Sequence, residues 1–555
     1  MEVMENSFLN WSEKISSDSN AVNLLGITSQ HLRIQRHFTP AITSMTNRIR
    51  YYTLLAYYWE YLKEEISSKD YEKIFILTCL AHHDGENKNP ELKYVFNNTK
   101  FVKTWENKDN FELSSFDING YASNYYKRQL EILRCAWTDE LRIPKFSPLN
   151  KMLADSMGDF PISFFKKKNF SKIELKEMGD KGFCICSLKN NSDEIDIMSK
   201  LFFGFFSKID NEWVIDIEEY DKFKNGHLNI SFEVNNEFYS DVENIRELNL
   251  RRRNTLFLFL KIIEKVKPNE KRDFDFRRCI WDAIYFAQNR YDHSPIDFKG
   301  LEKIRQYWEF FQLNIYFVYA MEKFLDIVQK IVALNSGIEK TKVLSILDEN
   351  KFYNELEDLL EVKFNSDSLI SNLIKVINNI NHSNKTSLDS KINESFIFDN
   401  LYNATSIESK LANILVILLL LYKRSELIEH QIKNYNYHDQ DDRLESLSMK
   451  AIFNFIKNND EEINIMGFLK DLCRNIINKH LYEVARRLSI GTKNWIFLEE
   501  DNRLYFERKS YVGFGPQDNR WLRIRNLLKD LQFIEFSENE VNLTDKGEIW
   551  LRRIE

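Results

Sequence analysis

The chain has 555 residues, too many for one hydrophobic core, so we expect two to four domains. Its 43% hydrophobic and 29% charged residues are the proportions of a soluble globular protein, and its formal charge of −7 excludes a generally basic coat for nucleic acid. Aromatic residues reach 14% while glycine (15) and proline (8) are scarce, which favours long helices over an all-β fold.

The first residues lack a charged segment followed by an apolar one, so we expect no secretory signal. The six cysteines are spread along the chain and form neither a disulfide framework nor a zinc-finger spacing. Cys184 and Cys186 stand as CxC in an apolar run, where we expect buried thiols on one side of a strand. These features predict a cytoplasmic protein without a metal or other cofactor.

In the first part of the chain, Thr46 is expected to cap a helix, and Asp70 a second one that Gly85 ends. The passage 25–52 resembles uncharacterised bacterial proteins without indicating a family. His82-His83-Asp84, at the end of the second helix, has two interpretations. It is either the HD pair of a metal phosphohydrolase or a pair of histidines that interact with the C-terminal helix dipole.

The composition changes between about 180 and 234, where GFCICSL, EWVIDIEE and HLNISFEV are expected to form strands. We therefore place a small α/β insert between helical regions. The expected domains are an N-terminal helical domain, the insert, a central helical domain, a second helical region and a C-terminal module, at 1–160, 161–240, 241–340, 341–490 and 491–555.

The most basic stretch is 245–280, where eleven basic residues stand against five acidic ones. Two helices joined near Pro268 bring these charges together, and nucleic-acid phosphates are the natural partner of such a surface. The alternative is a solvated helix pair with internal salt bridges. The candidate contacts are Arg251, Arg252, Arg253, Lys271, Arg272, Arg277 and Arg278.

Residues 300–334 predict one long helix with a narrow polar stripe and a wide apolar face, which requires several covering neighbours. A charge at almost every turn excludes a membrane span. In the second helical region, the apolar run within 407–431 is also too short to cross a bilayer.

Arg474-Asn475 followed by His480 lies in an expected helix and is similar to the RN-x4-H motif of HEPN ribonucleases. The resemblance implies that Arg474 and His480 converge near an RNA 2′-hydroxyl and the scissile phosphate, often across a dimer, with Asn475 orienting one of them. Histidine transfers protons near neutral pH and arginine offsets phosphate charge. The alternative is an exposed helix face.

The end of the chain predicts a hairpin at 495–508, a helix at 519–531, two short strands around the SENE turn, and a last helix. The order of helix, hairpin and helix resembles the second half of a winged-helix domain. The chain departs from that pattern in one respect, because a hairpin and not a second helix precedes the supposed recognition helix. The resemblance implies either DNA contact or a packing unit. The candidate DNA contacts are Arg520, Arg523 and Arg525, and a packing unit requires burial of Trp495, Phe497, Trp521, Leu527, Leu528, Phe533 and Trp550.

The whole sequence predicts a mainly α fold: a multi-helix body with a small α/β insert and a C-terminal winged-helix-like α+β module. We expect a cytoplasmic bacterial binding or scaffold component of a phage-defence or DNA-processing assembly. Its expected partners are DNA or RNA backbones and other protein subunits, without a membrane, and a homodimer is an option. The alternative is a metal-independent HEPN-like ribonuclease.

Overall fold

Helices carry most of the regular structure in the computed structural model, and the strands form small antiparallel sheets. This confirms the mainly α fold class. Apart from a few single residues between 25 and 42 and residue 230, the structure describes residues 48–84, 109–116, 122–138, 144–210, 212–228, 245–269, 273–381, 386–428, 447–489, 496–506, 520–537 and 540–554.

The first group of helices forms what we call the N-terminal lobe, in which α9 packs along α4 while α6 and α7 pack along α3. The Ser67 hydroxyl accepts a hydrogen bond from the Asp70 backbone amide, so Ser67 is the N-cap of α4. The helix therefore begins before Asp70, the residue that the sequence predicts as its cap. The helices are α3 (Arg50–Tyr57), α4 (Ser68–His82), α6 (Ala122–Ile132), α7 (Pro148–Asp155), α8 (Ile162–Phe165), α9 (Lys172–Asp180), α10 (Ser192–Phe202) and α11 (Ile217–Lys224).

Short strands join these helices, and only part of the expected α/β insert is present. EWVI forms β6, whereas the CxC run continues from an extended Cys184 into a 3₁₀ helix, η4 (Ile185–Asn190), instead of a strand. Of HLNISFEV, residues 227, 228 and 230 are not in a strand and 231–234 lie outside the described residues. The hairpins are β1 (Asn110–Glu112) with β4 (Asn169–Ser171), β2 (Ala136–Thr138) with β3 (Pro144–Phe146), and β5 (Phe206–Ile209) with β6 (Glu212–Ile215).

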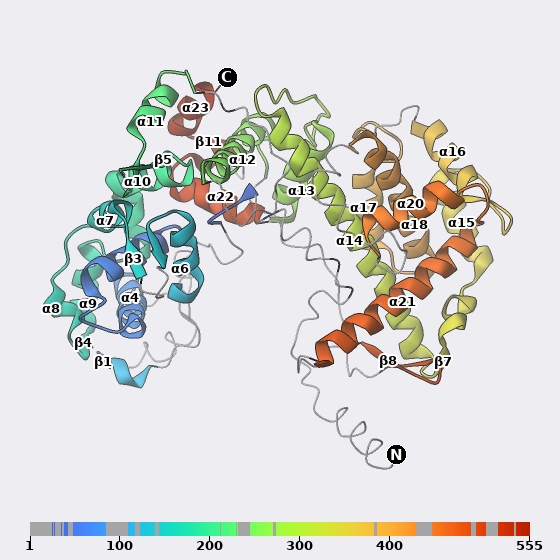
Figure 1. Ribbon diagram of the computed structural model, residues 1–555, viewed down its shortest axis with the longest axis horizontal. Coiled ribbons are helices and arrows are strands. Elements are labelled where there is room, and N and C mark those ends of the chain that lie inside the picture. Colours follow the sequence, from blue (N-terminus) through green and yellow to red (C-terminus); the bar gives the residue numbers. More distant parts are fainter. Residues whose placement is uncertain are drawn as a thin grey trace, which may run out of the picture.

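Two helices, α12 (Ile245–Val266) and α13 (Asp273–Phe286), lie between the N-terminal lobe and a second group of helices (Figure 1). The expected long helix is α14 (Glu302–Leu334), which packs against α12, α13, α18 and α21 and is buried over most of its surface. No helix in the described part of the chain is both long and apolar enough to cross a membrane.

The second group of helices surrounds the far end of α14, and we call it the second lobe (Figure 1). A three-stranded sheet, in the order β7–β9–β8, closes one end of it. Its elements are β7 (Ile338–Glu339), the 3₁₀ helix η5 (Lys340–Ile346), α15 (Glu349–Leu360), α16 (Ile370–Asn381), α17 (Glu394–Asn403), α18 (Ile407–Leu427), α20 (Met449–Asn459), α21 (Ile465–Ser489), β8 (Phe497–Glu500) and β9 (Arg503–Phe506).

The chain ends in what we call the C-terminal module: α22 (Trp521–Asp530), β10 (Ile534–Ser537), β11 (Glu540–Leu543) and α23 (Asp545–Arg552). The helix, hairpin and helix follow in the expected order, but the preceding β8–β9 hairpin pairs with β7 in the second lobe. The module packs against α12, α13 and the N-terminal lobe. The expected burial is confirmed for Phe497, Trp521, Leu527, Leu528, Phe533 and Trp550, while Trp495 lies outside the described residues.

Candidate metal centre and basic groove

The arginine triplet of the basic stretch lies inside the protein. Arg252 donates to the backbone oxygens of Phe202 and Leu201 at 2.6 and 2.9 Å, and Arg253 donates to those of Phe203 and Gly204 at 2.6 and 2.9 Å. These carbonyls belong to the C-terminal end of α10, where a cation is favourable. Both guanidinium groups therefore form hydrogen bonds inside the protein.

The neighbouring cations of the same stretch are also largely internal. Arg251 is buried against Glu247, and Arg278 is buried and donates to the Ser395 oxygen and Asp399, each at 3.0 Å. Arg277 is half-buried. The predicted phosphate surface is wrong for Arg251, Arg252, Arg253 and Arg278, because their side chains do not reach solvent; Lys271 and Arg272 lie outside the described residues.

The arginines of the C-terminal module do not form a basic face either. Arg520 is buried and donates to the Thr39 hydroxyl at 3.2 Å and the Ile42 oxygen at 2.5 Å. Arg525 is buried against the rings of Phe276 and Phe536, and Arg523 is half-buried. The expected DNA contact is therefore wrong for Arg520, whose guanidinium group donates inside the fold, whereas the contact through Arg525 stays a prediction.

The residues of the HEPN-like motif do not share a cleft. Arg474 is 60% exposed and pairs with Asp471 at 2.7 Å, whereas His480 is fully buried. The His480 Nε2 atom accepts a hydrogen bond from the Ile496 amide at 3.3 Å, and Asn475 donates to the Asp471 backbone oxygen at 2.8 Å. The catalytic interpretation is wrong within one subunit, because the histidine that would transfer a proton is inaccessible to RNA.

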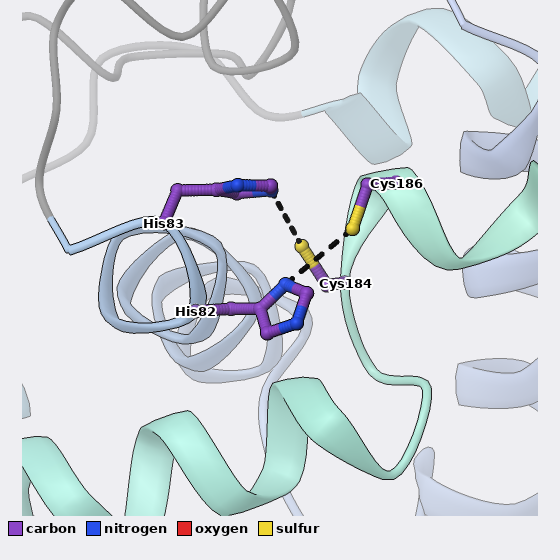
Figure 2. A group of neighbouring side chains, drawn as sticks. All are labelled: His82, His83, Cys184 and Cys186. Carbon is purple, nitrogen blue, oxygen red and sulfur yellow. Dashed lines mark hydrogen bonds between the residues drawn. The ribbon is translucent and has the colours of Figure 1, made fainter.

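A group of metal-ligating side chains appears instead at the end of α4. His82, His83, Cys184 and Cys186 each present one nitrogen or sulfur atom, and these four atoms lie within 4.8 Å of one another. Figure 2 shows the two imidazoles facing the two thiols, with His83 Nε2 3.4 Å from the Cys184 sulfur and His82 Nδ1 3.4 Å from the Cys186 sulfur. We call this group the Cys2His2 cluster.

Local backbone structure explains why these side chains converge. His82 is the last residue of α4, and His83 has left helical geometry with φ −106° and ψ 17°, so two successive histidines reach the same neighbour. On the other side, Cys184 is extended and Cys186 lies in the first turn of η4. The two pairs are separated by about a hundred residues of sequence and meet only through packing.

A third element, α9, supports the cluster from behind. The Asp180 carboxylate lies 3.3 Å from His82 Nε2, so the Nδ1 atom of that ring is left to face the thiols. Gly179 allows this close approach, since a Cβ atom there would lie 2.6 Å from the His82 Cβ atom. The end of α9 thus sets the orientation of one imidazole.

The two thiols of the cluster are protonated at neutral pH in the absence of a metal. A hydrogen bond with Cys184 and burial raise the pKa of Cys186 to about 12. The pKa of Cys184 is lowered by its hydrogen bond with Cys186 but raised more by a hydrogen bond with Cys79 and by burial. A bound divalent metal would reverse this balance, because a coordinating thiol loses its proton.

A groove of about 900 Å³ lies between η4 and the C-terminal module. Lys189 and Lys529 are exposed at its walls, and Lys546 is anchored by donating to the Ser199 hydroxyl and the Leu531 oxygen, both at 3.0 Å. We call it the basic groove. Its charged lining consists of Arg48, Lys189, Arg525, Lys529 and Lys546 against Asp530, Glu535 and Asp545.

No family model, no curated protein and no solved structure matches this chain.

The Cys2His2 cluster is not predicted as a unit by the sequence. The sequence connects His82-His83 with Asp84 and places CxC on a buried strand, so it does not combine the two pairs. The sequence contains one signal of this metal site, because each pair places two residues that can bind a metal next to each other or two positions apart. Nothing in the sequence indicated that the pairs would meet, because their contact depends on α4 and α9 packing together.

Proposed function

We propose that this protein is a binding scaffold and that the basic groove receives the backbone of a nucleic acid. The observation that supports this is an excess of basic over acidic residues, five against three, around a groove in a chain with a net charge of −7. One of the acidic residues, Asp530, already accepts hydrogen bonds from Arg48 and the Ile49 amide, at 3.0 and 3.1 Å. The local field therefore favours an anion.

The internal arginines support the scaffold part of the proposal. Arg252 and Arg253 connect α12 to the N-terminal lobe, and Arg278 connects α13 to α17 in the second lobe. Buried, hydrogen-bonded guanidinium groups fix relative positions, because moving the helices apart would leave charges unpaired. The basic stretch thus joins the two lobes from within.

A single-stranded nucleic acid suits the groove better than a small anion. Phe536 lines the groove, and Lys529 lies 4.1 Å from the centre of its ring. Proteins that bind single strands without sequence preference combine cations for phosphates with aromatic rings for bases. Both kinds of side chain are present along one wall.

The test is fluorescence anisotropy of the full chain with labelled single-stranded DNA and RNA across a salt series. Replacing Lys189 and Lys529 by Glu is expected to weaken binding about tenfold or more and to reduce the salt slope by about 1.4. The matched control is a double Glu variant of Lys167 and Lys222, two exposed lysines outside the groove. Absence of binding by the parent, or equal loss in both variants, would overturn the proposal.

The proposal includes a role in a nucleic-acid-processing or phage-defence assembly with other protein subunits. Co-purification of the native chain with the products of neighbouring genes tests that part. The geometry does not favour the ribonuclease alternative, because Arg474 is exposed and His480 is buried.

A further inference from the structure

The Cys2His2 cluster is the only group of three or more such ligating residues within metal-binding distance in the described part of the chain. We propose that His82, His83, Cys184 and Cys186 bind one Zn²⁺ ion, and that the ion holds the N-terminal lobe together. This site is independent of the basic groove and of the nucleic-acid partner proposed for it.

The distances fit a tetrahedral zinc site. With Zn–S bonds of about 2.3 Å and Zn–N bonds of about 2.0 Å, the sulfur and nitrogen ligands of one tetrahedral ion lie about 3.5 Å apart. The two sulfur–nitrogen distances of 3.4 Å agree with this edge, and no pair of the four atoms exceeds 4.8 Å. The pairs that lie further apart than this would have to move closer for all four atoms to bind one ion.

The ligand types select the metal. Two thiolates and two imidazoles are soft and intermediate donors, which favour zinc over the oxygen-seeking Mg²⁺ and Ca²⁺. Four protein ligands complete the tetrahedral shell of zinc and leave no position for water or substrate, so the site is structural rather than catalytic. Cys184 is buried, and the other three residues are half-buried, which shields the ion from solvent.

The surroundings supply the outer contacts that a zinc histidine requires. Asp180 lies 3.3 Å from the Nε2 atom of His82 while Nδ1 faces the cluster, as in carboxylate–histidine–zinc arrangements. Gly179 leaves the space that His82 occupies. Asp180 is therefore a positioning residue for the metal ligand.

Zinc in this position would cross-link parts of the chain that are distant in sequence. The ion would join the end of α4 to the start of η4. The C-terminal module packs on η4 through a hydrogen bond from the Gln532 side-chain amide to the Lys189 backbone oxygen at 2.9 Å. The neighbouring Ile185 oxygen lies 3.5 Å from Arg48, which pairs with Asp530 of α22. Metal binding thus stabilises the surface on which the C-terminal module docks.

The first experiment is elemental analysis of the full chain purified without chelator. We expect one zinc per chain, loss of the metal in the Cys184→Ser/Cys186→Ser double variant, and full retention in Cys473→Ser, a buried cysteine of α21 outside the cluster. Cobalt substitution should give the visible and near-ultraviolet bands of a tetrahedral thiolate site. A parent chain that holds no zinc and takes up neither Zn²⁺ nor Co²⁺ would overturn the proposal, as would another metal at the same stoichiometry.

A second variant keeps the test decisive if the double cysteine variant does not fold. Asp180→Asn leaves all four ligands in place and should weaken zinc affinity by about 10–100-fold in a chelator competition, while Glu177→Ala, an exposed change in the same helix, should not. Unchanged zinc affinity in Asp180→Asn would refute the positioning role. Chelation of the parent should also lower its Tm, and an unchanged Tm would refute the structural role.

Discussion

Buried arginines in this protein act as internal hydrogen-bond donors. Arg252 is fully buried and donates to the Phe202 and Leu201 oxygens and to Asn249. A guanidinium group makes these bonds at fixed angles, whereas a lysine ammonium cannot reach them all. The carbonyl oxygens at the end of α10 depend on this geometry for their hydrogen-bond donors.

Arg252→Lys is therefore expected to lower the free energy of unfolding by about 2–4 kcal/mol, since it leaves buried acceptors without donors. Urea denaturation measures the change. Arg552→Lys, at an exposed pair with Glu548, is the matched control and should change stability by less than about 0.5 kcal/mol. Equal stability of the two variants would contradict the internal role of Arg252.

Gly179 gives a second prediction at the scale of one residue. Alanine normally stabilises a helix by about 1 kcal/mol relative to glycine, but here its Cβ atom would lie 2.6 Å from the His82 Cβ atom. We expect Gly179→Ala to displace His82 and to weaken zinc binding about tenfold or more, measured by chelator competition. Retained affinity together with raised stability would show that the packing of α9 on α4 adjusts to the added methyl group.

At the scale of elements, α21 and the β8–β9 hairpin form one packed unit. The His480 ring lies 4.6 Å from the Phe497 ring, and its Nε2 atom accepts from the Ile496 amide. Arg474, six residues earlier on the same helix, is exposed. One face of α21 thus packs against the β8–β9 hairpin, and the opposite face is exposed to solvent.

This arrangement predicts opposite outcomes for the two residues of the HEPN-like motif. His480→Ala should lower the free energy of unfolding by about 2–4 kcal/mol, because it leaves a cavity and an unpaired buried amide. Arg474→Ala should change it by less than about 0.5 kcal/mol. Thermal and urea unfolding measure both. A stable His480→Ala protein that loses an RNA-cleaving activity of the parent would instead restore the ribonuclease interpretation.

Most of the helices could be predicted from sequence, because apolar spacing and the scarcity of glycine and proline both indicate them. The run GFCICSL was the clearest failure among the elements. Short apolar runs fit a buried strand and a buried turn equally well, and packing against α4 selects the turn. The same limit applies to the arginine triplet. The sequence shows the charges of Arg252 and Arg253 but not the carbonyls at the end of α10 that accept hydrogen bonds from them. The Cys2His2 cluster depends on a contact between distant segments, and no local pattern contains it.

For the whole molecule, the C-terminal module completes a hydrophobic core shared with α13 and α14. Trp521 meets Trp281 and Trp308 edge to face, with ring centres 5.7 and 6.3 Å apart. Trp550 packs against Phe203 and Phe223 of the N-terminal lobe, at 4.8 Å in each case. The module is thus part of the hydrophobic core rather than an appended reader of DNA.

Removing residues after 490 should therefore expose apolar surface and yield insoluble protein, which size-exclusion chromatography of the soluble fraction would show. Trp521→Ala is a milder form of the same change and should lower the free energy of unfolding by about 3–5 kcal/mol. As a control, Ile549→Ala alters an exposed side chain of the module and should be nearly neutral. A soluble, stably folded truncated chain would show that the module is independent.

The contacts of the C-terminal module also determine when this protein can finish folding during its synthesis. Arg520 donates hydrogen bonds to residues 39 and 42, and Asp530 pairs with Arg48, so the ribosome makes the two partners of each contact about 480 residues apart. Until α22 leaves the ribosome, the aromatic surfaces that it covers stay open to water and to other nascent chains. Interrupted translation would therefore release fragments that aggregate through exposed apolar surface. We expect the growing chain to depend on chaperones until α22 is made, rather than to fold domain by domain.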